Sequence, residues 1–173
     1  MQLLLAPQVT KRLKRELRRA GSREIGGLLM GESIGEDVFR VVDISVQRVG
    51  GSQACFVRRP DRHQADLEAF FARTGKDYTR FNYLGEWHSH PSFEPLPSTT
   101  DMHTMQAIVD DPTVGVNFAV LLIAKLTGNA IDATALAFRQ NGSPVPVNLS
   151  AEVDGDVTPE NSICRFFRKL FWS

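Results

Sequence analysis

Two histidines and an aspartate in the segment GEWHSHPSFEPLPSTTD, residues 85–101, stand at positions that suit metal binding. His88 and His90 are two residues apart on a predicted strand, so both imidazoles project to one side and could bind one cation. Asp101 closes an S-x-x-D sequence that starts at Ser98 and is typical of a helix's first turn. Three such ligands leave a tetrahedral zinc ion one position for water, as in hydrolytic centres. We therefore predict an open metal site.

Each half of this pattern also has an ordinary explanation. S-x-x-D is a common capping box, and an H-x-H pair often lies on a solvated strand face. The joined pattern H-S-H-P-x6-S-x-x-D, which follows an apolar strand, is much more specific than either half. The two cysteines, Cys55 and Cys164, are far apart and have no C-x-x-C spacing, which argues against a closed structural zinc site.

Length and charge limit the classes of function. A chain of 173 residues fits one domain that can bury a core without a metal or a disulfide. Its 20 basic and 20 acidic residues cancel, so it lacks the overall positive field of a general nucleic-acid binder. The short apolar start MQLLLAPQ precedes the basic residues, the reverse of a secretory signal, and no stretch is long enough to span a membrane. We expect a cytoplasmic protein with no membrane partner.

The hydrophobic pattern predicts an α+β fold, a single domain in which a central mixed or antiparallel sheet is flanked by helices. Periodicity and capping signals predict helices over residues 7–20, 60–74 and 98–109. Strands are expected over residues 23–32, 38–46, 80–90, 116–124 and 131–138, with the first hairpin turn at residues 31–37 and a short edge strand within 142–147.

Two segments before the metal-binding pattern carry further signals. The helix over residues 7–20 has a face of lysines and arginines, which is more often solvated than bound to phosphate. Gly26 and Gly27 inside a strand indicate a bulge or the close approach of another backbone. Glu24, just before them, is a candidate partner of the metal centre, although spacing alone favours an exposed carboxylate at a strand edge.

The last part of the chain is expected to extend the domain. We place the main domain at residues 1–147 and a polar linker with a C-terminal amphipathic helix at residues 148–173. Ile163, Phe166, Phe167 and Leu170 recur at helical spacing, so this helix is expected to pack on its own domain. A partner groove or a membrane surface is the weaker alternative.

Together these residues resemble the JAMM family of metalloproteases, also called MPN+ or JAB. The resemblance covers roughly residues 5–140 and consists of E-x-x-G-x-L-x-G from Glu24 and H-S-H-P-x6-S-x-x-D from His88. It implies a JAB/MPN domain with cytidine deaminase-like layering and one Zn²⁺ per chain, bound by His88, His90 and Asp101. It further implies that Glu24 acts as general base and then acid, and that Ser98 stabilises the oxyanion. A hydroxyl engaged in capping is less free for that second task.

The resemblance also implies a substrate. Family members hydrolyse the bond after the C-terminus of ubiquitin or a ubiquitin-like modifier. Ser92 after H-S-H-P, where many eukaryotic members have glycine, resembles the short bacterial JAB peptidases, including those of antiphage operons built on cGAS-like nucleotidyltransferases. A ubiquitin-like modifier, or a conjugated protein such as a cGAS-like nucleotidyltransferase, is therefore the expected partner. The alternatives are a non-catalytic MPN-type scaffold and a RadC-like DNA-associated protein.

Overall fold

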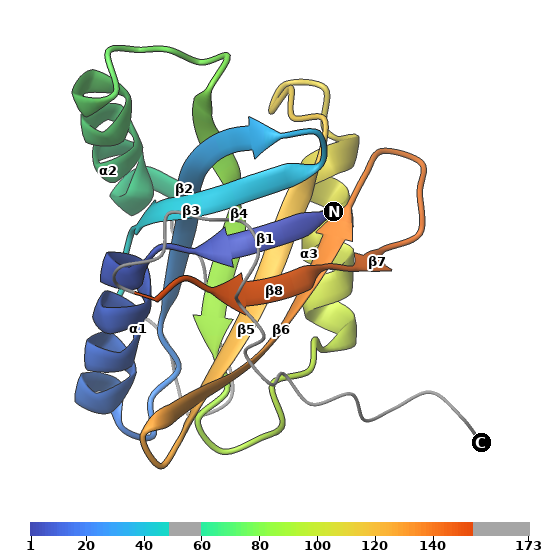
Figure 1. Cartoon of the computed structure of the whole chain (residues 1–173). Coiled ribbons are helices and arrows are strands. Elements are labelled where there is room, and N and C mark those ends of the chain that lie inside the picture. The colour runs from blue at the N-terminus through green and yellow to red at the C-terminus, as the bar shows by residue number, and fades with distance from the viewer. Residues whose placement is uncertain (49–59, 154–173) are drawn as a thin grey trace.

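The computed structural model describes residues 1–48 and 60–153 and, within them, one mixed β-sheet with three helices (Figure 1). The sheet has the strand order β7-β6-β5-β4-β2-β3-β1-β8. Its strands are β1 (Gln2–Leu5), β2 (Gly26–Gly35), β3 (Val38–Ile44), β4 (Phe81–Ser89), β5 (Ala119–Thr127), β6 (Ala130–Phe138), β7 (Val145–Pro146) and β8 (Asn148–Ala151). The helices are α1 (Pro7–Ala20), α2 (Pro60–Arg73) and α3 (Thr99–Asp110). The α+β prediction with a mixed sheet is confirmed.

The helices lie on opposite faces of the sheet because neighbouring strand residues point to opposite sides. On β2, Leu29 joins the core cluster beneath α1, whereas Leu28 and Met30 pack against Phe70 of α2. On β5, Leu122 packs with the α1 cluster and Ile123 with the α3 cluster. Residues 84–89 of β4 are buried between the layers, and the metal-binding pattern begins within the end of this buried stretch.

Two strands were missed by the sequence analysis. β1 pairs in parallel with β3 and with β8, and each of these contacts joins segments far apart in the chain. A strand of four residues has too few alternating positions to be recognised by periodicity. Residues 148–151, which we expected to begin a linker, instead form β8. The predicted C-terminal helix and both cysteines lie outside the described residues.

The segment 145–151 connects the two ends of the sheet. Val145 pairs with Ala137 of β6, and Asn148 pairs with Gln2 of β1. Between them, the Val147 N–H donates to the Ala135 carbonyl at 3.0 Å. Figure 1 shows β7 running on into β8, which lies beside β1. The sheet therefore curls until one short segment pairs with both of its ends.

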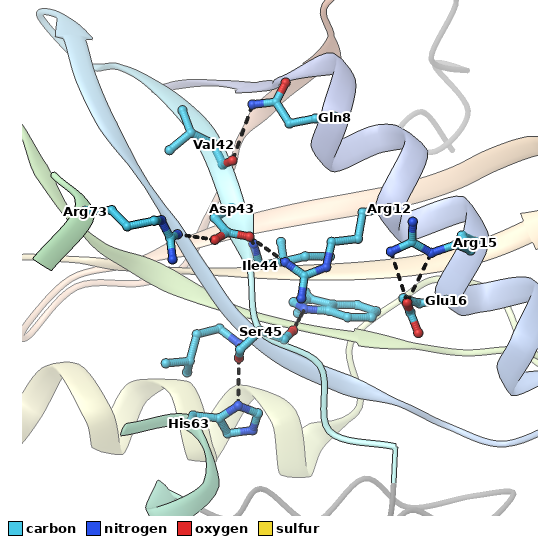
Figure 2. A network of polar contacts seen from close by, with 12 residues as sticks. Gln8, Arg12, Arg15, Glu16, Val42, Asp43, Ile44, Ser45, His63 and Arg73 are labelled. Atoms are coloured by element: carbon cyan, nitrogen blue, oxygen red, sulfur yellow. Dashed lines mark hydrogen bonds and ion pairs between the residues drawn. The ribbon is translucent and has the colours of Figure 1, made fainter. Parts of the chain in front are cut away.

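The basic face of α1 is largely solvated, as expected, although Arg12 and Lys14 are half-buried. Arg12 binds the Asp43 carboxylate at 2.6 Å, and Arg73 of α2 binds the other oxygen of the same carboxylate (Figure 2). Arg15 and Arg48 contact the buried carboxylate of Glu16, at 3.4 and 2.8 Å. Arg12 and Arg73 therefore tie α1 and α2 to β3 through Asp43. Among the helices of the described residues, none combines the length and apolarity needed to cross a bilayer.

Candidate metal centre

His88 and His90 are placed by the end of β4. His88 pairs with Gly26 of β2 and with Ile123 of β5, and the residue is only 6% exposed. His90 follows the last strand residue, and its N–H still donates to the Ala124 carbonyl at 3.0 Å. The two Nε2 atoms lie 3.2 Å apart. The predicted convergence of the two imidazoles on one side is confirmed.

Asp101 reaches the histidines from the first turn of α3. The predicted capping box is present: the Ser98 Oγ accepts from the Asp101 N–H at 3.2 Å, and Asp101 Oδ2 accepts from the Ser98 N–H at 2.7 Å. The second carboxylate oxygen, Oδ1, lies 3.5 Å from His88 Nε2. Burial raises the pKa of Asp101, but the hydrogen bonds from His88 and Ser98 outweigh it and hold the pKa well below its usual range. Asp101 is thus kept as a carboxylate.

The donor atoms fit a divalent metal ion. One ligand atom from each of His88, His90 and Asp101 lies within 4.8 Å of the others. Two ligands held about 2.0–2.1 Å from a tetrahedral ion are about 3.4 Å apart, close to the 3.2 and 3.5 Å found for two of these pairs. His90 Nδ1 lies 3.1 Å from the Glu94 carbonyl, which can only accept, so Nδ1 carries the proton and Nε2 presents its lone pair. Nitrogen and carboxylate donors of this kind suit zinc.

Glu24 is brought to this cluster by the pairing of β2 with β4. The Ser89 N–H donates to the Ile25 carbonyl at 2.8 Å, and the antiparallel register then sets Glu24 opposite His90. Its side chain is 6% exposed. Burial raises the pKa of Glu24, His90 and His88 lower it, and Asp101 raises it further, with a net upward shift. The raised pKa makes the Glu24 carboxylate a stronger proton acceptor than an ordinary glutamate.

Comparison with known proteins identifies the domain. The family described as prokaryotic homologs of the JAB domain matches residues 6–139. The chain belongs to this family. A CD-NTase/cGAS isopeptidase of Vibrio cholerae serotype O1 is 39% identical over 94 residues, which are 53% of this chain and 58% of that protein. The ubiquitin carboxyl-terminal hydrolase RPN11 of Saccharomyces cerevisiae is 29% identical over 117 residues, 61% of this chain and 37% of that protein.

A solved structure supports the same fold. The solution structure of a protein from Desulfitobacterium hafniense superimposes with a TM-score of 0.65 at 20% identity, covering 87% of this chain and 93% of that one. The matched regions span little more than half of the Vibrio protein and about a third of the yeast protein. The comparisons therefore establish the JAB domain and its fold, and the reaction is argued below from the site.

Three other polar residues near the motif lie outside the ligand cluster. Glu86 is buried on β4, opposite Leu28 of β2, and is not among the three clustered ligands. Glu94 has an exposed side chain, and it is its backbone carbonyl that contacts His90. His103 is exposed on α3 and also stands outside the cluster. None of these three side chains is therefore a member of the candidate ligand set.

Behind the metal ligands lies a buried polar network that supports β4. Trp87 is fully buried, and its Nε1–H donates to the Ser45 carbonyl at 3.0 Å. The Ser45 hydroxyl accepts from the Leu28 N–H at 2.8 Å and contacts His63 Nδ1 of α2 at 2.7 Å (Figure 2). At Gly27, an added Cβ would lie 2.1 Å from the Ser45 carbonyl oxygen. Gly27 is therefore a site of close backbone approach, one of the two predicted possibilities.

Sequence reasoning missed two residues of the site. Ser89 stands inside the H-S-H motif, where its position between the ligands was a usable signal. Its hydroxyl accepts from the Ile25 N–H at 3.0 Å. Thr134 of β6 donates through Oγ1 to the Pro95 carbonyl in the loop before α3. Nothing in the local sequence around Thr134 indicates this contact, because it joins segments 39 residues apart.

Proposed function

We propose that this JAB-domain protein is a zinc-dependent isopeptidase that hydrolyses the bond after the C-terminus of a ubiquitin-like modifier or of another conjugated protein. The observation that carries the proposal is the arrangement of four side chains from three separate segments. His88, His90 and Asp101 converge as ligands, and the buried carboxyl of Glu24 lies beside them. A purely structural metal site does not need a proton-accepting group beside its three ligands.

In the proposed mechanism, His88, His90 and Asp101 hold one zinc ion per chain. When bound there, zinc would polarise the scissile carbonyl and lower the pKa of a water molecule. Glu24 takes a proton from the attacking water and then passes it to the leaving amine. The Glu24 pKa, raised mainly by burial, makes the carboxylate a stronger proton acceptor than an ordinary glutamate, which suits the first of these transfers.

Ser98 is the proposed donor to the oxyanion, and its capping contacts determine whether its hydroxyl proton is available for that role. A hydroxyl has one proton to donate and two lone pairs. Accepting from the Asp101 N–H uses a lone pair, so the helix cap itself does not prevent donation to a substrate. The proton now points to Asp101 Oδ2, with Oγ and Oδ2 2.6 Å apart. Substrate therefore competes with Asp101 Oδ2 for this proton, and catalysis would require the hydroxyl to turn.

The proposed setting is a cytoplasmic, bacterial, ubiquitin-like deconjugation pathway of the antiphage type. The similarity to the CD-NTase/cGAS isopeptidase of Vibrio cholerae supports a cGAS-like nucleotidyltransferase as the conjugated partner. The ion pairs of Arg12 with Asp43 and of Arg15 with Glu16 offset part of the positive charge of α1, which weakens the case for a DNA-binding role of that helix.

The direct test is Glu24→Gln, with Glu94→Gln as the matched control on the exposed loop. The substrate is a ubiquitin-like modifier encoded beside the gene, fused through its C-terminus to a reporter protein. We expect Glu24→Gln to bind zinc stoichiometrically but to lower kcat by about 10²–10⁴-fold, the usual contribution of a general base. Glu94→Gln should retain full activity. Equal cleavage by Glu24→Gln and the unmodified protein would remove Glu24 from the mechanism, and bound zinc without cleavage of any fusion would favour a scaffold.

A further inference from the structure

The loop between His90 and Ser98 is held at two neighbouring carbonyl groups. The Glu94 carbonyl accepts from the Leu96 N–H at 2.8 Å, which closes a γ-turn around Pro95, and it also contacts His90 Nδ1 at 3.1 Å. The next carbonyl, of Pro95, accepts from the Thr134 hydroxyl. Pro95 is buried although Glu94 and Leu96 on either side are exposed. The loop thus turns inward at Pro95 and is anchored there.

Thr134 stands in the same row of the sheet as a metal ligand. His88 of β4 pairs with Ile123 of β5, and Ile123 pairs with Thr134 of β6. Residues paired across neighbouring strands project to the same face, so Thr134 and His88 lie on one side of the sheet. Thr134 is half-buried and reaches the loop that crosses this side.

The loop depends on side-chain donors because proline has no N–H. Pro91, Pro95 and Pro97 remove three backbone donors between His90 and Ser98. His90 in turn depends on the loop. Its backbone is bonded to Ala124, but it lies beyond the last residue of β4 and is less buried than His88. The contact of Nδ1 with the Glu94 carbonyl is what selects the tautomer and the direction of the ring.

We propose that Thr134 is a positioning residue for His90, acting through the Pro95 and Glu94 carbonyl groups. Its hydroxyl fixes Pro95, the γ-turn carries that constraint to the Glu94 carbonyl, and this carbonyl holds the His90 N–H so that Nε2 faces His88 and Asp101. Without the hydroxyl, the turn is free to move away from the sheet. His90 then loses its orientation while His88 keeps its own. The inference rests on the metal site of the proposed function and does not depend on which bond is cleaved.

The test is Co²⁺ binding to the metal-free protein, followed by the visible absorption of the bound ion. Thr134→Val removes the hydroxyl at nearly constant shape, and Thr134→Ser retains it. Thr113→Val is the matched control, because the Thr113 hydroxyl donates to Asp111 at 2.7 Å in an exposed turn. We expect Thr134→Val to bind Co²⁺ about tenfold more weakly, at the lower end of the effect usual for groups that orient a ligand. Thr134→Ser and Thr113→Val should bind Co²⁺ as the unmodified protein does.

A second measurement separates positioning from loss of stability. The ¹⁵N chemical shifts of the His90 ring in metal-free protein should report one tautomer, protonated at Nδ1, in the unmodified protein and in Thr134→Ser. Thr134→Val should show a mixture of the two His90 tautomers at a temperature where circular dichroism shows that the variant is folded. If Thr134→Val does not fold, Thr134→Ala is measured in its place. Equal Co²⁺ affinity of the hydroxyl-free and control variants would overturn the role of Thr134.

The failure of this inference is distinguishable from failure of the proposed function. An unmodified protein that binds no Co²⁺ would overturn both. Tight Co²⁺ binding that weakens in Thr134→Val, together with no cleavage of any modifier fusion, would overturn the isopeptidase proposal and leave the positioning role of Thr134 supported.

Discussion

Ser89 and Ile25 exchange two hydrogen bonds that join the segment of the proposed base, Glu24, to that of the proposed metal ligands. The Ser89 N–H donates to the Ile25 carbonyl at 2.8 Å, and the Ile25 N–H donates to the Ser89 hydroxyl at 3.0 Å. Both residues are 1% exposed. Ser89 lies between the two histidines and Ile25 directly follows Glu24, so this pair holds Glu24 beside the two histidines.

Ser89→Ala should therefore affect both stability and catalysis. It leaves the buried Ile25 N–H without its acceptor, which we expect to lower the free energy of unfolding by about 1–3 kcal/mol. Urea denaturation measures this loss. Ser92→Ala, on the exposed part of the loop, is the control and should unfold at the unmodified midpoint. Equal midpoints for the two variants would show that the Ser89 hydroxyl contributes nothing to the fold.

Gly27→Ala should be among the most destabilising changes in the sheet. The added Cβ would meet the Ser45 carbonyl oxygen at 2.1 Å, and that oxygen already binds Trp87. Relieving such a clash moves backbone and costs about 1–3 kcal/mol or more. Gly35→Ala is the matched control in the same strand, since its Cβ would find no atom closer than 3.7 Å. Thermal unfolding of both variants would compare them, and a stable Gly27→Ala would contradict the close approach.

Zinc should raise the thermal stability of the protein through His88. A ligand that binds only the folded state at about 100 times its Kd adds about 2.7 kcal/mol to the free energy of unfolding. We expect zinc to raise Tm and a chelator to reverse the rise. His88→Ala should abolish this zinc-dependent difference, whereas His103→Ala, an exposed residue of α3 outside the cluster, should preserve it. A zinc response that survives in His88→Ala would place the ion elsewhere.

Glu16 should make the stability of the fold dependent on acidic pH. Burial raises the pKa of Glu16, but Arg48 and Arg15 outweigh it, and the net pKa lies below the ordinary value of 4.5. A group with a lowered folded-state pKa stabilises above its unfolded pKa, and that contribution disappears as pH falls through the folded pKa. Glu16→Gln should thus cost about 1 kcal/mol at neutral pH, because both arginines are largely exposed.

The stability difference between Glu16→Gln and the unmodified protein should then narrow as pH falls below 4.5. Urea unfolding across this pH range measures it. Glu36→Gln, an exposed turn residue, should give no such pH-dependent difference. If the difference in unfolding free energy between the two proteins instead grew as pH fell, the downward shift assigned to the Glu16 pKa would be wrong.

The sequence predicted those parts of the site that are defined by local geometry. The i, i+2 spacing of His88 and His90 and the capping box of Ser98 and Asp101 are local properties, and the structure confirms both. The ends of the elements were less accurate. The first hairpin turn was expected at residues 31–37, but β2 continues to Gly35 because pairing with β3 extends it.

Contacts between distant segments could not be predicted from local patterns. The position of Glu24 depends on the register of β2 against β4, and the contact of Thr134 depends on the register of β6 as well. Periodicity indicates that a strand exists and which residues share a face, but not which strand it joins. For the same reason, the parallel partners of β1 were not foreseen.

The seven residues from Val145 to Ala151 act as a clasp, since they occupy the outer positions of the sheet at both ends. A protein truncated after Val147 would lack β8, so the backbone amides and carbonyls of Gln2–Leu5 that pair with β8 would face solvent. An unpaired edge strand of this kind can pair with strands of other molecules. The variant truncated after Val147 is therefore expected to aggregate on expression, even though His88, His90 and Asp101 would all still be present.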